Sequence, residues 1–348
     1  TIPNIPSLEG LTVYFAFVTL DPNQQKLPKL IASISSAVPV KLVTGKERIQ
    51  IKNSWLPALT KYHSCAENSA THKFYCFGGH GYTGSYSVLD QILEYDSIND
   101  KVTVKKAVLP GSRLYASCAE DSSTHKIYCF GGAQDFYATL PRYRQIVEYD
   151  SINDKTLIKK AVLPPATFTY YALEIGLSCV ENSATHKIYC FGENRIAEYD
   201  PAIDNLTVVK AKLQSRLLFL SCAENSVTHK IYCFGGGRYS DAIFEYDPIK
   251  DIITYKNAKL PVARRSLSCS ENSATHKIYC FGGEQNSNGY NRIDEYNPGS
   301  DTLVVKKSTF PRGVYGLGCA ENSATHEFYC FGGNSNNGRQ IIEYDPGS

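Results

Sequence analysis

The sequence predicts an all-β protein built from six copies of one four-stranded antiparallel sheet. A cysteine-containing motif occurs six times at intervals of 43 to 61 residues, and each copy belongs to a unit of short segments with strand character separated by turn residues. The motif reads CAENSATHKFYCFGG at Cys65, and its other copies begin at Cys118, Cys179, Cys222, Cys269 and Cys319. The repeats cover residues 45–348, so residues 1–44 form an N-terminal extension.

Each repeat contains four predicted strands, which we call a, b, c and d in chain order. Strand a ends at the first cysteine, and strand b is a Lys-Ile/Phe-Tyr-Cys-Phe run that Gly-Gly ends in most copies. Strand c carries a Glu-Tyr-Asp-type triplet, and strand d alternates β-branched residues with lysine. Strand b is apolar on both faces, with Ile188 and Cys190 on one and Tyr189 and Phe191 on the other. Neighbouring sheets must therefore cover both faces.

The repeats resemble those of the kelch family. The resemblance rests on the Gly-Gly pair after strand b, on the following Tyr-Asp and on the Pro-x-x-Arg before the next repeat. The pairs are Gly78-Gly79, Gly131-Gly132, Gly235-Gly236, Gly282-Gly283 and Gly332-Gly333. The third repeat departs from this pattern with Gly192-Glu193, and residues such as Val102 and Leu206 replace the usual tryptophan of strand d. The resemblance implies a six-bladed β-propeller of four-stranded antiparallel blades around a central channel.

The two ends of the chain predict how the ring of blades closes. The sixth repeat ends after its strand c, residues 340–345, and has no strand d of its own. Residues 47–56 align with strand d of the first repeat, so we predict that they form the outer strand of the last blade and pair with 340–345. The extension 1–44 contains one predicted apolar strand, Leu11–Leu20. This strand either packs on its own propeller or supports self-assembly by adding to a sheet of another copy.

All twelve cysteines fall into six C-x10-C pairs, one in each repeat. The pairs are Cys65 and Cys76, Cys118 and Cys129, Cys179 and Cys190, Cys222 and Cys233, Cys269 and Cys280, and Cys319 and Cys330. This spacing sets the two cysteines side by side on one hairpin, within reach of a disulfide. Zinc fits the spacing poorly, and a reduced buried core is the remaining alternative. The strict pairing favours six disulfides and hence a secreted or cell-surface variant of the family, and the glycosylation sequon at Asn205 agrees with that location.

Charge and hydropathy exclude several classes of function. A net charge of +2 provides no basic surface for nucleic acid, and no segment approaches the ~20 apolar residues of a membrane helix. We expect no cofactor and no metal. The hairpin histidines recur in every repeat, so the repeat itself explains them, and hairpin tips of different blades lie too far apart to share an ion. They are His72, His125, His186, His229, His276 and His326.

The connections from strand b to c and from strand d to the next strand a vary between repeats and emerge on the same face of a blade. Variable loops on a rigid scaffold are the usual place for binding. Eleven of the 12 arginines lie there, but Arg113, Arg216, Arg264 and Arg312 follow Leu-Pro or its equivalent, where a structural role is expected. Arginine recognises carboxylate and phosphate, and tyrosine anchors binding surfaces. The predicted ligand-binding residues are Arg142, Arg144, Arg195, Arg238, Arg265, Arg292, Arg339, Tyr82, Tyr137, Tyr171, Tyr239 and Tyr290.

These features favour a non-catalytic extracellular binding, adhesion or structural module whose variable face takes an anionic glycan or protein ligand. Two alternatives remain. The first is a secreted sugar-modifying enzyme of the kelch type, such as a mutarotase acting on sialic acid, although no motif identifies an acid and base pair. The second is a structural subunit of an extracellular filament or sheath.

Overall fold

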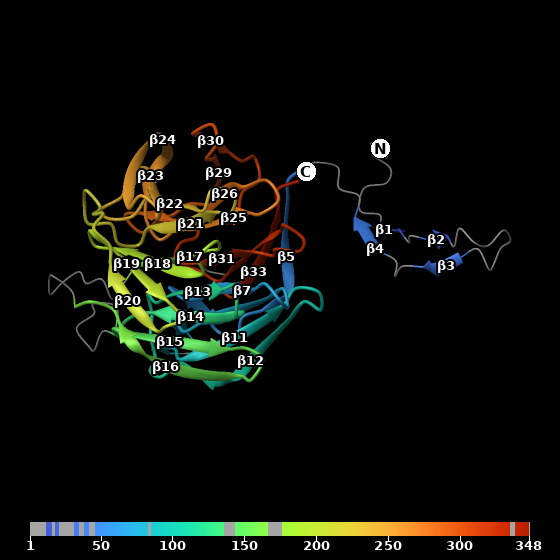
Figure 1. Cartoon of the computed structure of the whole chain (residues 1–348), viewed down its shortest axis with the longest axis horizontal. Helices are drawn as coiled ribbons and strands as arrows, with labels where there is room; N and C mark the ends of the chain where they lie inside the picture. Colours follow the sequence, from blue (N-terminus) through green and yellow to red (C-terminus); the bar gives the residue numbers. More distant parts are fainter. Residues whose placement is uncertain are drawn as a thin grey trace. The chain divides into compact units, whose positions relative to one another are not determined.

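The computed structural model describes residues 46–82, 85–135, 143–165, 176–334 and 338–347, together with four short strands before residue 46. Every regular element in these ranges is a β-strand (Figure 1). None of the described segments forms a helix of the length and apolarity that crossing a membrane requires. The chain separates into two compact parts, Thr1–Arg48 with Pro346–Ser348, and Ile49–Asp345.

The N-terminal part contains two small antiparallel pairs of strands. Strand β1 (Thr12–Phe15) pairs with β4 (Val38–Lys41), and β2 (Val18–Leu20) pairs with β3 (Ile31–Ile34). The segment predicted as one strand, Leu11–Leu20, therefore contains two strands, and each has its partner within this part of the chain. Self-assembly through residues 1–44 stays a prediction.

The second part contains six four-stranded antiparallel sheets, one for each repeat. Sheet 1 is formed by β7 (Ser64–Asn68), β8 (Lys73–Phe77), β11 (Gln91–Asp96) and β12 (Lys101–Val108). Sheet 2 is formed by β13 (Ser117–Asp121), β14 (Lys126–Phe130), β15 (Gln145–Asp150) and β16 (Lys155–Val162). Sheet 3 is formed by β17 (Ser178–Asn182), β18 (Lys187–Gly192), β19 (Arg195–Asp200) and β20 (Asn205–Val208).

The remaining three sheets follow the same order. Sheet 4 is formed by β21 (Ser221–Asn225), β22 (Lys230–Phe234), β23 (Ser240–Asp247) and β24 (Ile252–Arg264). Sheet 5 is formed by β25 (Ser268–Asn272), β26 (Lys277–Phe281), β29 (Ile293–Asn297) and β30 (Thr302–Val305). Sheet 6 is formed by β31 (Gly318–Glu321), β32 (Phe328–Phe331), β33 (Gln340–Asp345) and β5 (Arg48–Trp55). The sequon residue Asn205 is the exposed first residue of β20.

Strand β5 completes sheet 6 from the other end of the sequence, which confirms the predicted pairing of residues 47–56 with 340–345. Figure 1 shows this strand, in blue, beside the red C-terminal strands. Two further contacts reinforce the pairing: the Lys52 side chain donates to Glu343 at 2.8 Å, and the backbone amide of Leu56 donates to the Arg339 carbonyl at 2.8 Å. Without β5, the backbone groups on the outer edge of β33 would lack their ladder partners.

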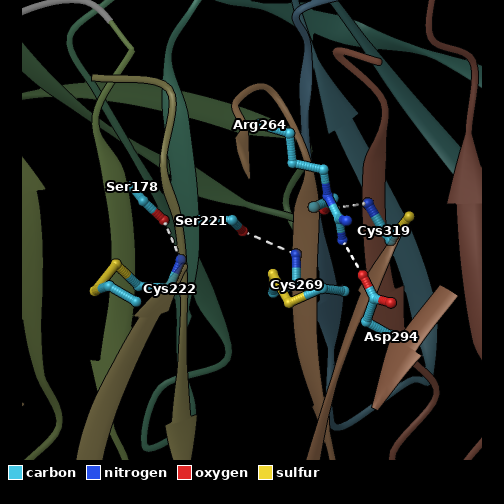
Figure 2. The surroundings of a disulfide bond; sticks show 10 residues. Ser178, Ser221, Cys222, Arg264, Cys269, Asp294 and Cys319 are labelled. Carbon is cyan, nitrogen blue, oxygen red and sulfur yellow. Dashed lines mark hydrogen bonds and ion pairs between the residues drawn. A yellow bond between two sulfur atoms is a disulfide. The ribbon is translucent and has the colours of Figure 1, made fainter. Parts of the chain in front are cut away.

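Each sheet carries one disulfide, which joins the two cysteines of its C-x10-C pair across strands a and b. The six predicted disulfides are therefore present, and none of the twelve cysteines is free. The serine before each first cysteine accepts a hydrogen bond from the cysteine amide of the next sheet, at 2.8–3.0 Å (Figure 2). In sheet 6 this position is Gly318, where a Cβ would lie 2.9 Å from Cys65 Sγ of sheet 1.

A second set of contacts joins the hairpins between strands a and b. The predicted end of strand a was wrong, because the strand begins one residue before the first cysteine and includes the glutamate two residues after it. In every sheet this strand a glutamate accepts a hydrogen bond from a serine amide of the preceding sheet, at 2.7–2.9 Å. The set includes Ser323 of sheet 6, which donates to Glu67 of sheet 1. The hairpin histidine lies 3.0–3.3 Å from the same glutamate, and its φ is positive in all six copies. These contacts give the six histidines a structural role between sheets.

The hydrophobic core lies between neighbouring sheets, because strand b is apolar on both faces. Tyr149 of sheet 2 packs on Phe77 of sheet 1 with ring centroids 5.6 Å apart, and Tyr199 of sheet 3 packs on Phe130 of sheet 2 in the same way. One core cluster joins sheets 6 and 1, with Phe331 packed on Phe74 at 5.6 Å. Neighbouring sheets thus cover both apolar faces of strand b, as the sequence predicted.

The strand c glutamates lie in ion pairs within their own sheets. Glu94 accepts from Lys73 and Lys105, both at 2.9 Å, and Glu295 accepts from Lys277 at 2.7 Å and Lys306 at 2.8 Å. These two carboxylates belong to separate sheets and hold lysines of strands b and d. A structural role therefore accounts for them.

Candidate functional site

The variable connections meet at a cycle of backbone hydrogen bonds. Each participating amide donates to the carbonyl of the corresponding residue in a neighbouring repeat, at 2.6–3.3 Å, and all six residues have a φ of 54–64°. The cycle passes through Tyr62, Tyr115, Gly176, Phe219, Ser266 and Gly316 and returns to Tyr62. These residues border a narrow hollow of about 90 Å³. Glycine is required at position 316, because a Cβ there would lie 2.7 Å from the Tyr62 ring.

The structure gives partners to most of the predicted arginines. Arg195 pairs with Glu193 at 3.2 Å, Arg265 with Glu284 at 2.7 Å, and Arg292 with Asp294 at 3.0 Å. Two others hold the scaffold through backbone carbonyls at 2.7 Å, Arg144 Nε donating to Leu163 and Arg339 Nε to Leu56. Arg142, Tyr137 and Tyr171 lie outside the described residues.

Three arginines border one hollow of about 310 Å³, which we call the arginine hollow. Arg216, Arg238 and Arg265 line it together with Leu218, Phe219 and Gly237. The Arg265 guanidinium lies 5.6 Å from the Phe219 ring and 5.0 Å from the Tyr239 ring, so two aromatic faces and Glu284 hold it in place. Arg216 and Arg238 are exposed, and the described lining includes no acidic side chain.

Position relative to the next cysteine separates structural arginines from exposed ones. Arg113 and Arg264, five residues before that cysteine, are fully buried. Arg113 donates to the Gly131 and Pro110 carbonyls at 3.1 and 3.2 Å, and Arg264 pairs with buried Asp294 (Figure 2). Arg216 is six residues and Arg312 seven residues before its cysteine, and both are exposed at hollows. The structural role that the sequence predicted for these four arginines therefore fits Arg113 and Arg264. The number of residues before the next cysteine would have distinguished them from Arg216 and Arg312.

A second and larger depression of about 750 Å³ lies among the connections of sheets 1, 5 and 6, and we call it the large hollow. Strand β6 (Leu59–Lys61), β9 (His80–Tyr82) and β10 (Tyr86–Val88) form a three-stranded sheet that borders it. The short hairpin of β27 (Glu284–Gln285) and β28 (Asn288–Gly289) contributes Asn288 and Gly289 to the lining. Sequence reasoning placed Tyr82 among the ligand-binding residues but missed most of this lining.

Aromatic side chains form part of the large hollow. Tyr86 is 73% exposed, and its ring stacks on His80 with centroids 5.1 Å apart and planes 10° apart. Tyr82 lies 4.7 Å from Tyr86, so the exposed ring is supported by two neighbours. Burial, with the nearby Lys61 charge, lowers the pKa of His80 to about 4, so its imidazole is neutral at physiological pH.

A chain of polar side chains lies beside these rings. Lys61 Nζ donates to Asn334 Oδ1 at 2.9 Å, and Asn334 Nδ2 donates to the Tyr315 hydroxyl at 2.6 Å. Burial lowers the pKa of Lys61. Arg312 adds an exposed guanidinium, and the described residues that line the hollow include no Asp or Glu. The hollow thus offers hydroxyl, amide and cationic groups beside aromatic faces.

Two groups of potential metal ligands occur among the described residues. His63 lies near Cys65 and Cys76, but these sulfurs form a disulfide. Asp121, Glu181 and His186 form the second group, in which Asp121 already accepts hydrogen bonds from Ser123 and Thr124. The expectation that no metal binds stays a prediction.

Comparison with protein-family models gives no match for this chain, and comparison with curated proteins gives none either. The kelch resemblance therefore depends on the repeat motif and the sheet architecture.

Proposed function

We propose that the six sheets close into a six-bladed β-propeller of the kelch type. Three sets of contacts support closure, because each continues from sheet 6 to sheet 1. Ser323 donates to Glu67, Gly318 lies against Cys65, and the Tyr62 amide donates to the Gly316 carbonyl at 2.7 Å. Six disulfides favour an oxidising compartment, so we place the protein outside the cell or on its surface.

On this scaffold we propose a non-catalytic extracellular module that binds an acidic glycan. The arginine hollow carries the proposal, because three guanidinium groups surround one depression whose described lining has no carboxylate. Arg265 pairs with Glu284, and Arg216 and Arg238 are exposed at the same depression, where a ligand can reach them. Arginine presents a planar set of donors that matches carboxylate and sulfate oxygens.

A glycan array probed at low and at physiological salt tests this function. Sialylated or sulfated glycans are expected to bind, and binding is expected to weaken as salt screens the arginines. Arg238→Ala and Arg216→Ala should each reduce affinity about tenfold, the loss of one or two charge-assisted hydrogen bonds. Lys101→Ala in strand d is the matched control, since this exposed lysine does not line either hollow.

The proposal fails if neutral glycans bind as well as acidic ones, or if Lys101→Ala weakens binding as much as Arg238→Ala. Capture of an acidic protein with no glycan signal would replace the glycan by a protein partner. A regular polymer in size measurements with no glycan signal would support the structural subunit instead.

A further inference from the structure

The large hollow is built by segments that the repeat itself does not require. In sheet 3, strand b continues into strand c through a tight turn at Gly192 to Arg195, so a blade forms without an inserted hairpin. In sheets 1 and 5 the same connection contains extra strands, β9 with β10 and β27 with β28. Both insertions border the large hollow. The additional structure of two separate repeats therefore contributes to one depression.

The exposed position of the Tyr86 ring does not contribute to the stability of the fold. A tyrosine that is 73% exposed leaves most of its apolar face in water. The stack on His80 and the contact with Tyr82 nevertheless hold it in a defined position. A fixed aromatic face loses little conformational entropy when a ligand packs on it. Apolar C–H groups of a ligand would bury this surface.

The rest of the lining specifies the polar groups of that ligand. Asn334 offers amide hydrogen-bonding capacity beside Lys61 and Tyr315, and Asn288 adds a second amide. These groups suit a ligand that carries several hydroxyls, each able both to donate and to accept. A pyranose combines such hydroxyls at its edge with an apolar C–H face. The volume of about 750 Å³ is within the range of small-molecule sites.

We propose that the large hollow is a saccharide-binding site in which a pyranose ring packs on Tyr86 and its hydroxyls bond to Asn334 and Lys61. The site is separate from the arginine hollow, because the two depressions share no lining residue. It therefore recognises the sugar ring itself and does not need the arginine hollow.

Calorimetric titration with neutral trisaccharides of glucose, galactose, mannose and N-acetylglucosamine tests the site. At least one is expected to bind to the wild-type chain. Tyr86→Ala should weaken that binding about tenfold, the upper range for loss of one aromatic face. Tyr86→Phe keeps the face and should bind within about twofold of wild type. Asn334→Ala should also weaken binding, whereas Arg238→Ala should leave it unchanged.

The outcomes separate this site from the proposed acidic-glycan function. If no neutral trisaccharide binds, or if Tyr86→Ala binds as tightly as Tyr86→Phe, the saccharide site is refuted even where acidic glycans bind. If neutral saccharides bind and acidic groups on a glycan do not increase its affinity, the saccharide site in the large hollow is supported and the proposed function of the arginine hollow is refuted. Tyr86 and Arg238 are exposed, so both variants are expected to fold, which thermal unfolding would verify.

Discussion

The six strand a glutamates predict an unusual dependence of stability on pH. Carboxyls from all six sheets line one hollow of about 260 Å³. They are Glu67, Glu120, Glu181, Glu224, Glu271 and Glu321. Burial raises the pKa of each carboxyl despite hydrogen bonds from serine and, for most of them, histidine. The largest effect is on Glu321, where burial, against hydrogen bonds from Ser273 and with repulsion from Glu67 and Glu271, raises the pKa to about 8.

A carboxyl whose pKa is higher in the folded state than in the unfolded chain stabilises the fold when protonated. That contribution is fully present below the unfolded pKa of 4.5 and is lost as pH rises through about 8. Ionisation of Glu321 therefore lowers the free energy of unfolding by at most about 5 kcal/mol. The neighbouring glutamates share the repulsion, so we expect Glu321→Gln to recover about 2 kcal/mol at pH 9.

The interval from pH 6.5 to 9 brackets the ionisation of Glu321. Burial lowers the pKa of His63 and His80 to about 4, so their destabilising protonation occurs below pH 6.5. The cysteines are all disulfide-bonded and do not titrate. Urea unfolding of the wild-type chain should therefore show stability falling between pH 6.5 and 9. Glu321→Gln should flatten this dependence and be the more stable protein at pH 9.

Glu295→Gln provides a control of opposite sign. Burial opposes ionisation of Glu295, but hydrogen bonds from Lys277 and Lys306 outweigh it and lower the pKa to about 2. This substitution should destabilise the protein throughout the same interval. A wild-type chain equally stable at pH 6.5 and 9, or a Glu321→Gln variant less stable than wild type at pH 9, would refute the reasoning.

Four further predictions follow from named contacts. Gly316→Ala should lower the free energy of unfolding in urea by about 2 kcal/mol, because it forces a Cβ toward the Tyr62 ring at a φ of +64°; unchanged stability would contradict this close approach. Arg264→Ala should lower the free energy of unfolding by about 3 kcal/mol, because the buried carboxylate of Asp294 loses an ion-pair partner. Arg238→Ala should leave the melting temperature unchanged. A chain beginning at residue 57 lacks β5 and should lose cooperative unfolding, whereas one beginning at residue 45 should keep it; equal cooperativity would oppose the role of β5. Mass spectrometry after alkylation without reductant should find all twelve cysteines unmodified, and labelled thiols in native protein would exclude the disulfide framework.

The repeat made most of the fold predictable. A feature present six times shows its own spacing, so strand b, the cysteine pairs and the missing strand d of the last repeat were visible without coordinates. The hydrogen-bond cycle was not visible, because its six positions hold tyrosine, glycine, phenylalanine and serine. What they share is a backbone conformation with positive φ, and no single residue type marks it.

The arginines show how residue type and residue position differ as guides to a site. Arg264 and Arg265 are adjacent in sequence, yet Arg264 is fully buried against Asp294 and Arg265 lines the arginine hollow. Arg264 is the last residue of β24, and successive side chains of a strand point to opposite faces. A shift of one residue relative to the following cysteine therefore moves a guanidinium from the core to the surface. Arg216 is one residue and Arg312 two residues out of this position, and both are exposed on irregular connections, where the alternation of a strand does not apply. The arginine near this position is therefore buried or exposed according to its distance from the following cysteine, while the sheets themselves stay the same.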